Sequence, residues 1–235
     1  ARVTLRGLIA SRSPHVTTSE PSAEQPSPQT AAFASLALKP ELLQALESLG
    51  FTRMTPIQAQ SLPPILQGRD VIGQARTGSG KTAAYGLGLL SRIDPALEQV
   101  QALVLCPTRE LADQIAKEIR RLARCLPNVK LSQLNGGISQ RPQLASLQHA
   151  PQIIVGMAGR VLEHLEQGSL DLSGLRVLVL DEADRMLDGD FEAASQAIVK
   201  HTPAQRQTLF FSATYNDSVR ALSARIQRDP LSISV

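Results

Sequence analysis

Residues 75–82 read Ala75-Arg76-Thr77-Gly78-Ser79-Gly80-Lys81-Thr82, and this stretch decides the fold. An apolar run, residues 70–74, precedes it, and residues 83–90 continue as a helical pattern. The order predicts a strand, a glycine-rich loop and a helix, whose backbone N–H groups and N-terminus bind phosphate oxygens. Lys81 is then expected to reach the β- and γ-phosphates of a nucleotide, and Thr82 to bind magnesium. An ordinary glycine turn would explain the glycines but not the Lys-Thr pair directly after them.

A second buried strand ends in a group of acids. Residues 175–180 are almost continuously apolar, as parallel strands covered on both faces are, and Asp181-Glu182-Ala183-Asp184 follows. Ligands of open α/β sheets bind beyond the carboxyl ends of the strands. We therefore expect Asp181 to hold magnesium through water and Glu182 to position the attacking water. The alternative is an acidic helix start, which the helix dipole alone would favour.

Apolar runs and helical patterns alternate from Phe33 to the end of the chain. Strands are expected near residues 70–75, 101–106, 129–134, 152–156, 175–180, 207–211 and 231–235. This alternation predicts an α/β fold, a parallel sheet with right-handed crossovers and flanking helices. The helix after Pro107 carries a core-facing apolar stripe formed by Leu111, Ile115, Ile119, Leu122 and Leu126. Its cations Lys117, Arg121 and Arg124 share another face, which we interpret as a solvated surface.

Composition separates the N-terminal segment from the rest. Ser, Thr, Pro, Gln and Glu dominate residues 11–30, and no hydrophobic period emerges, which predicts that residues 1–32 form a disordered tail. The net charge of +3 is compatible with nucleic acid without demanding it. No apolar run approaches the roughly 18 residues of a membrane span, so we expect no membrane association. The two cysteines, Cys106 and Cys125, are too few for a disulfide framework, and we expect a cytoplasmic location.

Seven motifs occur in the order that is typical of DEAD-box RNA helicases, and the chain resembles the first RecA-like domain of that family. Ala75, which departs from the generic phosphate-loop pattern, is the family's usual residue. The resemblance covers residues 33–235, which implies a RecA-like P-loop NTPase domain that runs from the Q motif to motif III. The motifs are Gly50-Phe51 with Thr55-Pro56-Ile57-Gln58, the loop 75–82, Pro107-Thr108-Arg109-Glu110-Leu111-Ala112, Gly136-Gly137, Met157-Ala158-Gly159-Arg160, Asp181-Glu182-Ala183-Asp184 and Ser212-Ala213-Thr214.

The resemblance implies ATP and Mg²⁺ as ligands. A glutamine amide offers one donor and one acceptor, which match the N6 and N7 edge of adenine, so Gln58 is expected to select ATP over GTP. Lys81, Asp181 and Glu182 are the expected catalytic residues, and Thr82 and Asp181 the expected magnesium ligands. The expected nucleotide-binding residues are Phe33, stacking on adenine, Gln58, Ala75, Thr77, Gly78, Ser79, Gly80, Lys81 and Thr82.

The family's RNA-binding positions fall on loop residues here. Arginine pairs with phosphate through its fork, and glycine lets a phosphodiester approach the backbone closely. Without the resemblance, these residues would be taken for ordinary loop glycines and solvated charges. Asp184 with Ser212 and Thr214 is expected to couple the ATP state to the RNA state through hydrogen bonds. The expected RNA-binding residues are Thr108, Arg109, Gly136, Gly137 and Arg160.

Two departures from the family pattern concern RNA. Met157-Ala158 stands where the family has Thr-Pro, so a hydroxyl donor to phosphate and a helix-starting proline are missing. Gly189-Asp190 stands where the family has Met-Gly, and Asp190 is expected to repel a nearby phosphate. Both departures lower the RNA affinity that we expect and leave ATP binding untouched.

The sequence therefore predicts the ATP-binding domain of an ATP-dependent RNA helicase. Four segments resemble bacterial members of the family that act in ribosome assembly, which implies ribosomal RNA as the partner. The motifs of the second RecA-like domain are not found in residues 1–235, so these residues alone are expected to be nearly inactive. Two alternatives remain: a non-catalytic ATP- and RNA-binding half-module, and a P-loop ATPase acting on DNA, against which Gln58 and the complete acidic motif argue.

Overall fold

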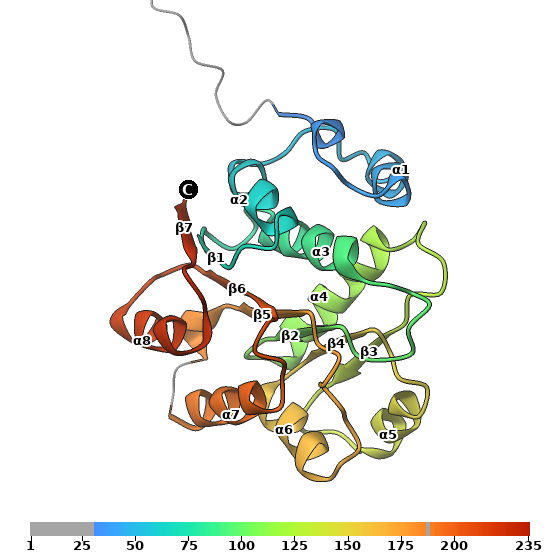
Figure 1. The fold of residues 1–235 in the computed structure, drawn as a ribbon, viewed down its shortest axis with the longest axis vertical. Helices are drawn as coiled ribbons and strands as arrows, with labels where there is room; N and C mark the ends of the chain where they lie inside the picture. The colour runs from blue at the N-terminus through green and yellow to red at the C-terminus, as the bar shows by residue number, and fades with distance from the viewer. Residues whose placement is uncertain (1–30, 187–188) are drawn as a thin grey trace, which may run out of the picture.

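A single parallel sheet organises the molecule, shown in Figure 1 as a computed structural model that describes residues 31–186 and 189–235. The expected disordered tail, residues 1–32, lies almost entirely outside this range. The strand order is β3-β4-β2-β5-β6-β1-β7, and every neighbouring pair is parallel. The strands are β1 (Val71–Gln74), β2 (Ala102–Leu105), β3 (Leu131–Leu134), β4 (Ile153–Gly156), β5 (Val177–Asp181), β6 (Gln207–Ser212) and β7 (Leu231–Ser234). The α/β prediction is confirmed, including the expected strand at the end of the chain.

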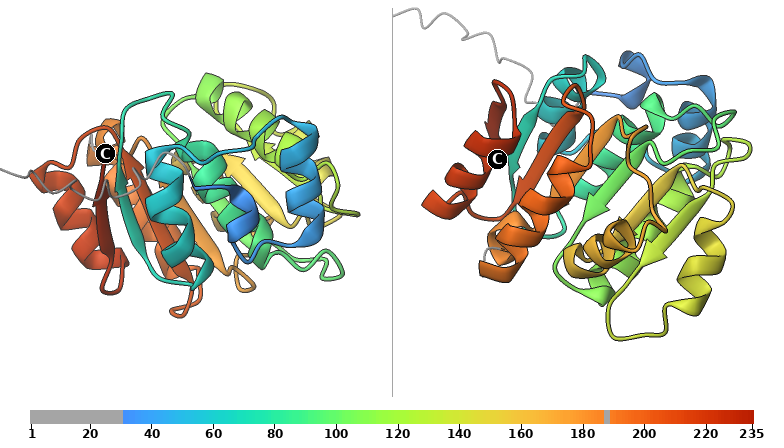
Figure 2. Two further views of the ribbon diagram at one scale, coloured as in Figure 1. Left: turned by 90° about the horizontal axis from the view of Figure 1, so that it is seen from above. Right: turned by 60° about the horizontal axis from the view of Figure 1, so that its bottom comes forward.

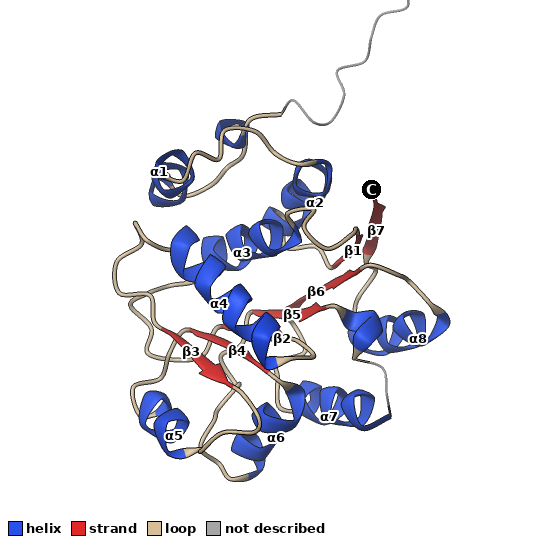
Figure 3. Cartoon of the chain, turned by 180° about the vertical axis from the view of Figure 1, so that it is seen from behind, coloured by secondary structure: helices blue, strands red, loops and turns tan. Residues whose placement is uncertain are grey.

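Helices cover both faces of the sheet, as the two views in Figure 2 and the view from behind in Figure 3 show. Helices α1 to α4 pack on one face and share one hydrophobic core, whereas α6 to α8 pack on the other face around a second core. The helices are α1 (Pro40–Ser48), α2 (Pro56–Leu66), α3 (Lys81–Arg92), α4 (Arg109–Leu122), α5 (Arg141–Leu147), α6 (Ala158–Glu166), α7 (Gly189–Lys200) and α8 (Asp217–Ile226), with short 3-10 turns at Phe33–Ser35 and Ala183–Arg185.

The central strands are buried on both sides because their alternate side chains enter different cores. In β5, Val177 and Val179 face the α1–α4 side, and Leu178 and Leu180 face the other. This arrangement explains why the strand reads as a continuous apolar run rather than an alternating one. It leaves the loops at the carboxyl ends of the strands as the places where polar side chains gather.

The strand order brings the two chemical motifs together. β6 lies between β1 and β5, so the phosphate loop after β1 and the acids after β5 flank the end of β6. That end carries Ser212, which is paired in register with Gln74 of β1. Residues from three distant parts of the sequence therefore meet at one edge of the sheet.

Two remaining sequence expectations concern the cysteines and the membrane. Cys106 is fully buried after β2, and burial raises the pKa of its thiol to about 12, so it behaves as a small core residue. Across residues 31–186 and 189–235, no helix combines the length and the apolar character that crossing a bilayer requires.

Candidate active site

The loop between β1 and α3 has the conformation of a phosphate cradle. Gly78 and Gly80 adopt positive φ angles of 81° and 94°, which are left-handed conformations that side chains disfavour. Gly80 is the N-cap of α3, so the first free N–H groups of the helix face the loop. Lys81 is only 6% exposed, and its Nζ donates a hydrogen bond to the Ala75 carbonyl at 2.8 Å. The lysine is thereby held over the loop from which a phosphate would be bound.

Gln58 is tied directly to this loop. Its Oε1 accepts a hydrogen bond from the Thr55 backbone N–H at 2.9 Å, and its Nε2 donates to the Gly80 carbonyl at 3.1 Å. A Cβ on Gly80 would lie 2.5 Å from that Nε2, so glycine is required there for a second reason. An amide has two donors and two acceptor lone pairs, so one of each remains. The Gln58 amide is thus oriented by the protein and still able to bind a ligand edge.

One cavity of about 510 Å³ connects these groups, with Gln58, Gly80, Lys81, Thr82, Asp181 and Glu182 among its lining residues. Phe51 lines it as well. Phe33 does not: it is 3% exposed and packed into the core beside α1, so its ring has no free face for stacking. We therefore expect Phe51, rather than Phe33, to stack on adenine.

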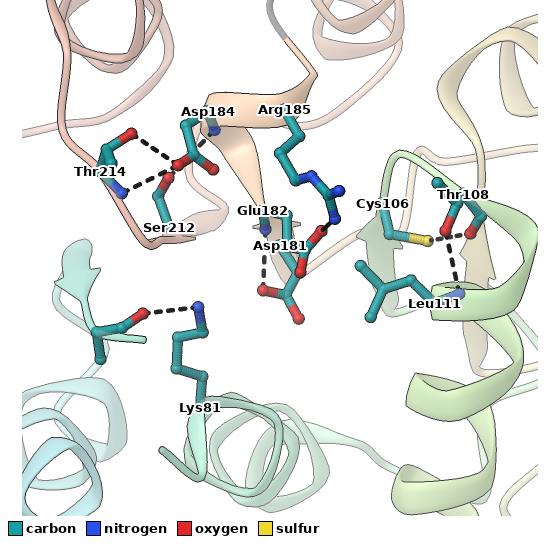
Figure 4. Close-up of polar contacts among 11 residues, drawn as sticks. Lys81, Cys106, Thr108, Leu111, Asp181, Glu182, Asp184, Arg185, Ser212 and Thr214 are labelled. Carbon is teal, nitrogen blue, oxygen red and sulfur yellow. Dashed lines mark hydrogen bonds and ion pairs between the residues drawn. The ribbon is translucent and has the colours of Figure 1, made fainter. Parts of the chain in front are cut away.

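Asp181 is a buried carboxylate held by two donors, as Figure 4 shows for one of them. Its Oδ1 accepts from the Glu182 N–H at 2.9 Å, and its Oδ2 accepts from the Tyr85 hydroxyl at 2.8 Å. Burial raises the pKa of Asp181, although the Tyr85 hydrogen bond and the Lys81 charge oppose that shift. A cation bound nearby would therefore stabilise the ionised form of the Asp181 carboxylate.

Glu182 has an unusual backbone. Its φ of 54° and ψ of 46° place a non-glycine residue in the left-handed region, a costly conformation that clusters at functional sites. Its Oε2 forms an ion pair with Arg185 Nη1 at 2.8 Å. One carboxylate oxygen is therefore engaged by Arg185, and the other, Oε1, can still accept a hydrogen bond from a water.

Asp184 bridges the ends of β5 and β6 (Figure 4). Its Oδ2 accepts from the Thr214 backbone N–H at 3.0 Å and from Thr214 Oγ1 at 2.7 Å, while its own N–H donates to Ser212 Oγ at 3.1 Å. Burial opposes ionisation of Asp184, but the hydrogen bonds from Thr214 and Ser212 outweigh it and lower the pKa. The structure brings these three residues together as expected.

The expected RNA-binding residues lie along the same edge of the sheet. Thr108 caps α4 by accepting the Leu111 N–H at 3.2 Å, and Arg109 at the first helical position is exposed. Gly137 is exposed with a φ of 73°. Arg160 differs: its side chain is 10% exposed, pairing with Glu163 and donating to the Ile138 carbonyl at 3.1 Å. Arg160 therefore stabilises the loop that contains Gly136 and Gly137, and its guanidinium is not free to pair with a phosphate.

The two departures differ in what the structure shows. Met157 is the N-cap of α6 without a side-chain cap bond, and its Sδ lies 4.0 Å from the position of a Cβ on Gly136. A thioether thus stands beside the glycine loop at the place where the family has a hydroxyl. Gly189 and Asp190 begin α7, but their side-chain environment lies outside the described part, so the expected repulsion by Asp190 stays a prediction.

Comparison with protein families gives one match that includes this whole site except its upstream Phe51. The DEAD/DEAH box helicase model matches residues 55–222. The chain belongs to the DEAD/DEAH box helicase family. This assignment agrees with the Q motif–loop contact, the acids after β5 and the Asp184 bridge, which the fold places at one edge.

Relatives and solved structures of DEAD-box proteins agree with the assignment. The ATP-dependent RNA helicase DbpA of Escherichia coli is 57% identical over 205 residues, which are 87% of this chain and 45% of that protein. DeaD of the same organism is 45% identical over 86% of this chain and 32% of its own length. A DEAD box protein structure from Methanococcus jannaschii superposes with a TM-score of 0.83 at 34% identity, over 88% of this chain and 56% of that one. The chain thus spans less than half of these two curated relatives.

Two residues of this DEAD-box site were missed from the sequence. Phe51 belongs to the Q motif, but its place in the cavity depends on how the turn before α2 folds. Tyr85 was read as an ordinary helical residue, yet its hydroxyl reaches Asp181, and its ring packs on Phe211 with centroids 5.3 Å apart. A tyrosine rather than a phenylalanine one turn after Lys81 is the only sequence signal for this bond.

The raised pKa of Asp181 leads to a prediction about stability and pH. At neutral pH the ionised carboxylate is disfavoured in the fold, so Asp181→Asn should raise the melting temperature, by about 2–4 °C for each 1 kcal/mol gained. Because the folded pKa is raised, the wild type regains this stability as pH falls and Asp181 is protonated. Thermal melts between pH 4 and 8, with Asp229→Asn as an exposed control, measure the difference. A gain that does not change with pH would contradict the assignment of the effect to this carboxyl.

Proposed function

We propose that this chain is the ATP-binding domain of an RNA helicase that couples ATP hydrolysis to the separation of RNA strands. The observation that carries the proposal is the double contact of Gln58. Its amide is bonded to the phosphate loop at Gly80, and it lines the same cavity as Lys81 and Asp181. An adenine-reading group, a phosphate-binding group and an acid are thereby joined in one site.

The donor set fits magnesium bound together with phosphate. Among the described residues no three His, Cys, Asp or Glu side chains form a metal cluster. Mg²⁺ commonly takes one or two protein oxygens and completes its shell with water and substrate phosphate. Thr82 and Asp181 line the cavity and would supply those oxygens, directly and through water. The ion would neutralise the charge that develops on the phosphates.

The protein's own groups divide the hydrolysis between them. Lys81 exchanges its bond to the Ala75 carbonyl for the phosphates, which restores a charged partner to a nearly buried ammonium. Glu182 orients the attacking water, through the carboxylate oxygen that does not pair with Arg185. Phosphoryl transfer of this kind depends on positioning and charge stabilisation, and these residues provide both.

The Asp184 bridge supports a coupling role. It joins the loop after β5, which carries Glu182, to the loop after β6 through Thr214 and Ser212. A change at the nucleotide can therefore alter the position of the β6 loop. RNA backbone contacts at Thr108, Arg109, Gly136 and Gly137 read the shape of the strand rather than its bases.

Ribosomal RNA is the proposed partner, supported by the likeness of this chain to DbpA. A cytoplasmic location goes with this assignment, and two free cysteines are compatible with a reducing compartment. A second RecA-like domain is a further proposed partner, since the solved DEAD-box neighbour is longer than the region matched here. The coverage of 45% of DbpA also keeps open a non-catalytic ATP- and RNA-binding half.

Replacing Gln58 tests the proposal. Gln58→Ala should remove about 1–3 kcal/mol of the preference for ATP over GTP, because a bidentate contact to the adenine edge is lost. Titration calorimetry with both nucleotides measures the preference. Gln60→Ala is the matched control, since Gln60 is exposed on the same helix. Equal affinity of the unmutated chain for ATP and GTP would overturn the assignment of Gln58 and with it the ATP-specific function.

A further inference from the structure

A groove runs along one face of α4, and another face of the same helix, with Leu111, Gln114, Ile115 and Glu118, lines the nucleotide cavity. Two cavities of about 380 Å³ and about 660 Å³ share Asp113, Arg120 and Gln133 in their linings. The first begins at Arg109, and the second ends at Arg124. Figure 3 shows α4 crossing the sheet beside β3, with α5 below. We call this continuous surface from Arg109 to Arg124 the α4 groove.

The charge of the α4 groove is strongly positive. Five of its six charged lining residues are cations: Arg109, Lys117, Arg120, Arg121 and Arg124. The single acid, Asp113, accepts a hydrogen bond from Gln133 Nε2 at 2.7 Å, which occupies part of its carboxylate. The surface therefore suits an anion.

The cations that line this groove are mostly free to bind. Arg121 pairs with Glu118 at 2.8 Å, and Arg120 donates to the Leu131 carbonyl at 3.3 Å. Lys117 and Arg124 are exposed and form no side-chain hydrogen bond or ion pair with any residue that the structure describes. The helix dipole can account for basic residues in the last turn but not for Lys117 in the middle of α4.

The spacing of the cations follows one side of the helix. Arg109, Lys117 and Arg120 are separated by eight and three residues within α4, which places them along one face, and Arg124 follows in the turn after the helix. At 1.5 Å per residue the helix from Arg109 to Leu122 extends about 20 Å. That length suits an extended polyanion that already contacts Arg109 better than a small anion.

A polar group in the groove points to the same kind of ligand. Asn135 is 4% exposed, lines the smaller cavity beside Gly136, and its Oδ1 has no hydrogen-bond donor among the described residues. A buried amide oxygen without a donor is costly, and a ligand that brings a hydroxyl could relieve the cost. RNA carries a 2′-hydroxyl next to every phosphate.

We propose that the α4 groove binds the sugar–phosphate backbone of single-stranded RNA that continues from Arg109. Lys117, Arg120 and Arg124 take its phosphates, and Asn135 lies where the strand passes the glycine loop. This inference rests on the proposed function, because Arg109 is both a residue of the proposed RNA site and the first residue of the groove. It replaces the interpretation of Lys117 and Arg124 as solvated charges, whereas Arg121 pairs with Glu118.

The test compares two RNA lengths in fluorescence anisotropy titrations. Lys117→Gln with Arg124→Gln should weaken binding of a labelled oligoribonucleotide of about 15 nucleotides on the order of tenfold and reduce its salt slope by about 1.4. An RNA of about 5 nucleotides, confined to the site at Arg109, should bind as before. Lys200→Gln with Arg225→Gln makes the same charge change on α7 and α8, across the sheet, and should leave both affinities unchanged.

Arg109→Gln distinguishes a failure of the groove inference from a failure of the proposed function. If Arg109→Gln weakens both RNAs while the groove variant changes neither, the groove inference fails and the proposed function stands. If Arg109→Gln changes neither RNA, the RNA-binding function itself is contradicted. If the groove variant and the α7–α8 control lose RNA affinity equally, the effect is one of net charge, and the groove inference is contradicted. Unchanged nucleotide affinity and melting temperature confirm that each variant is folded.

Discussion

Lys81→Ala is expected to weaken ATP binding by about 3–5 kcal/mol, because a buried phosphate charge would lose its partner. Lys81 is nearly buried above the phosphate loop and bonded to the Ala75 carbonyl, and the described residues that line the nucleotide cavity include no second cation to replace it. Titration calorimetry with ATP, in the presence and absence of magnesium, measures the loss.

Lys39→Ala is the matched control for this experiment. Lys39 is also a partly buried lysine that bonds backbone carbonyls, donating to Ile93 at 2.7 Å and Leu90 at 3.3 Å, but it does not line the nucleotide cavity. Its loss should lower stability without changing ATP affinity. Nucleotide affinity that survives Lys81→Ala would show that the loop binds no phosphate.

The 235 residues assayed alone are expected to show no RNA-stimulated ATP hydrolysis above background. The family resemblance assigns the arginine finger to a second RecA-like domain, and such a finger is worth roughly 10³–10⁵ in rate. Joining the chain to the second domain of a relative such as DbpA should therefore raise the rate by that order. Phosphate release with and without structured RNA measures it, and Glu182→Gln provides the blank.

The outcome of that assay also distinguishes a catalytic domain that needs a second RecA-like domain from a non-catalytic ATP- and RNA-binding half-module. RNA-stimulated turnover by the 235 residues within tenfold of the two-domain protein would show that the chain completes its own site. Turnover that stays at the blank after the second domain is joined would favour the non-catalytic half-module. The Arg185–Glu182 ion pair can then be tested as the cause by replacing Arg185 with Gln.

Local sequence was sufficient for the elements and for the motifs. The strands were predicted within about two residues because central parallel strands must be apolar on both faces. The phosphate loop was recognised from the Lys81-Thr82 pair directly after the glycines, and the positive φ angles at Gly78 and Gly80 match that prediction. Asp184, Ser212 and Thr214 were grouped through the family resemblance, and the hydrogen bonds between them match that grouping.

Contacts between distant segments could not be read from local sequence. Phe33 and Phe51 are both aromatic residues near the Q motif, and only the packing of α1 decides which ring is buried. Arg160 looked like a free phosphate ligand until the fold placed the Ile138 carbonyl beside it. The Tyr85–Asp181 bond joins residues 96 positions apart.

The sequence by itself determined the α/β alternation, the phosphate loop and the family, because these depend on residue type and short-range spacing. Only the tertiary structure decided that β6 separates β1 from β5, that Gln58 bonds the loop at Gly80, and that the α4 cations line a groove continuous with Arg109. The physical reason is that backbone preference and hydrophobic period act within a few residues. Burial, charge and hydrogen-bond satisfaction depend on which segments the folded sheet brings side by side.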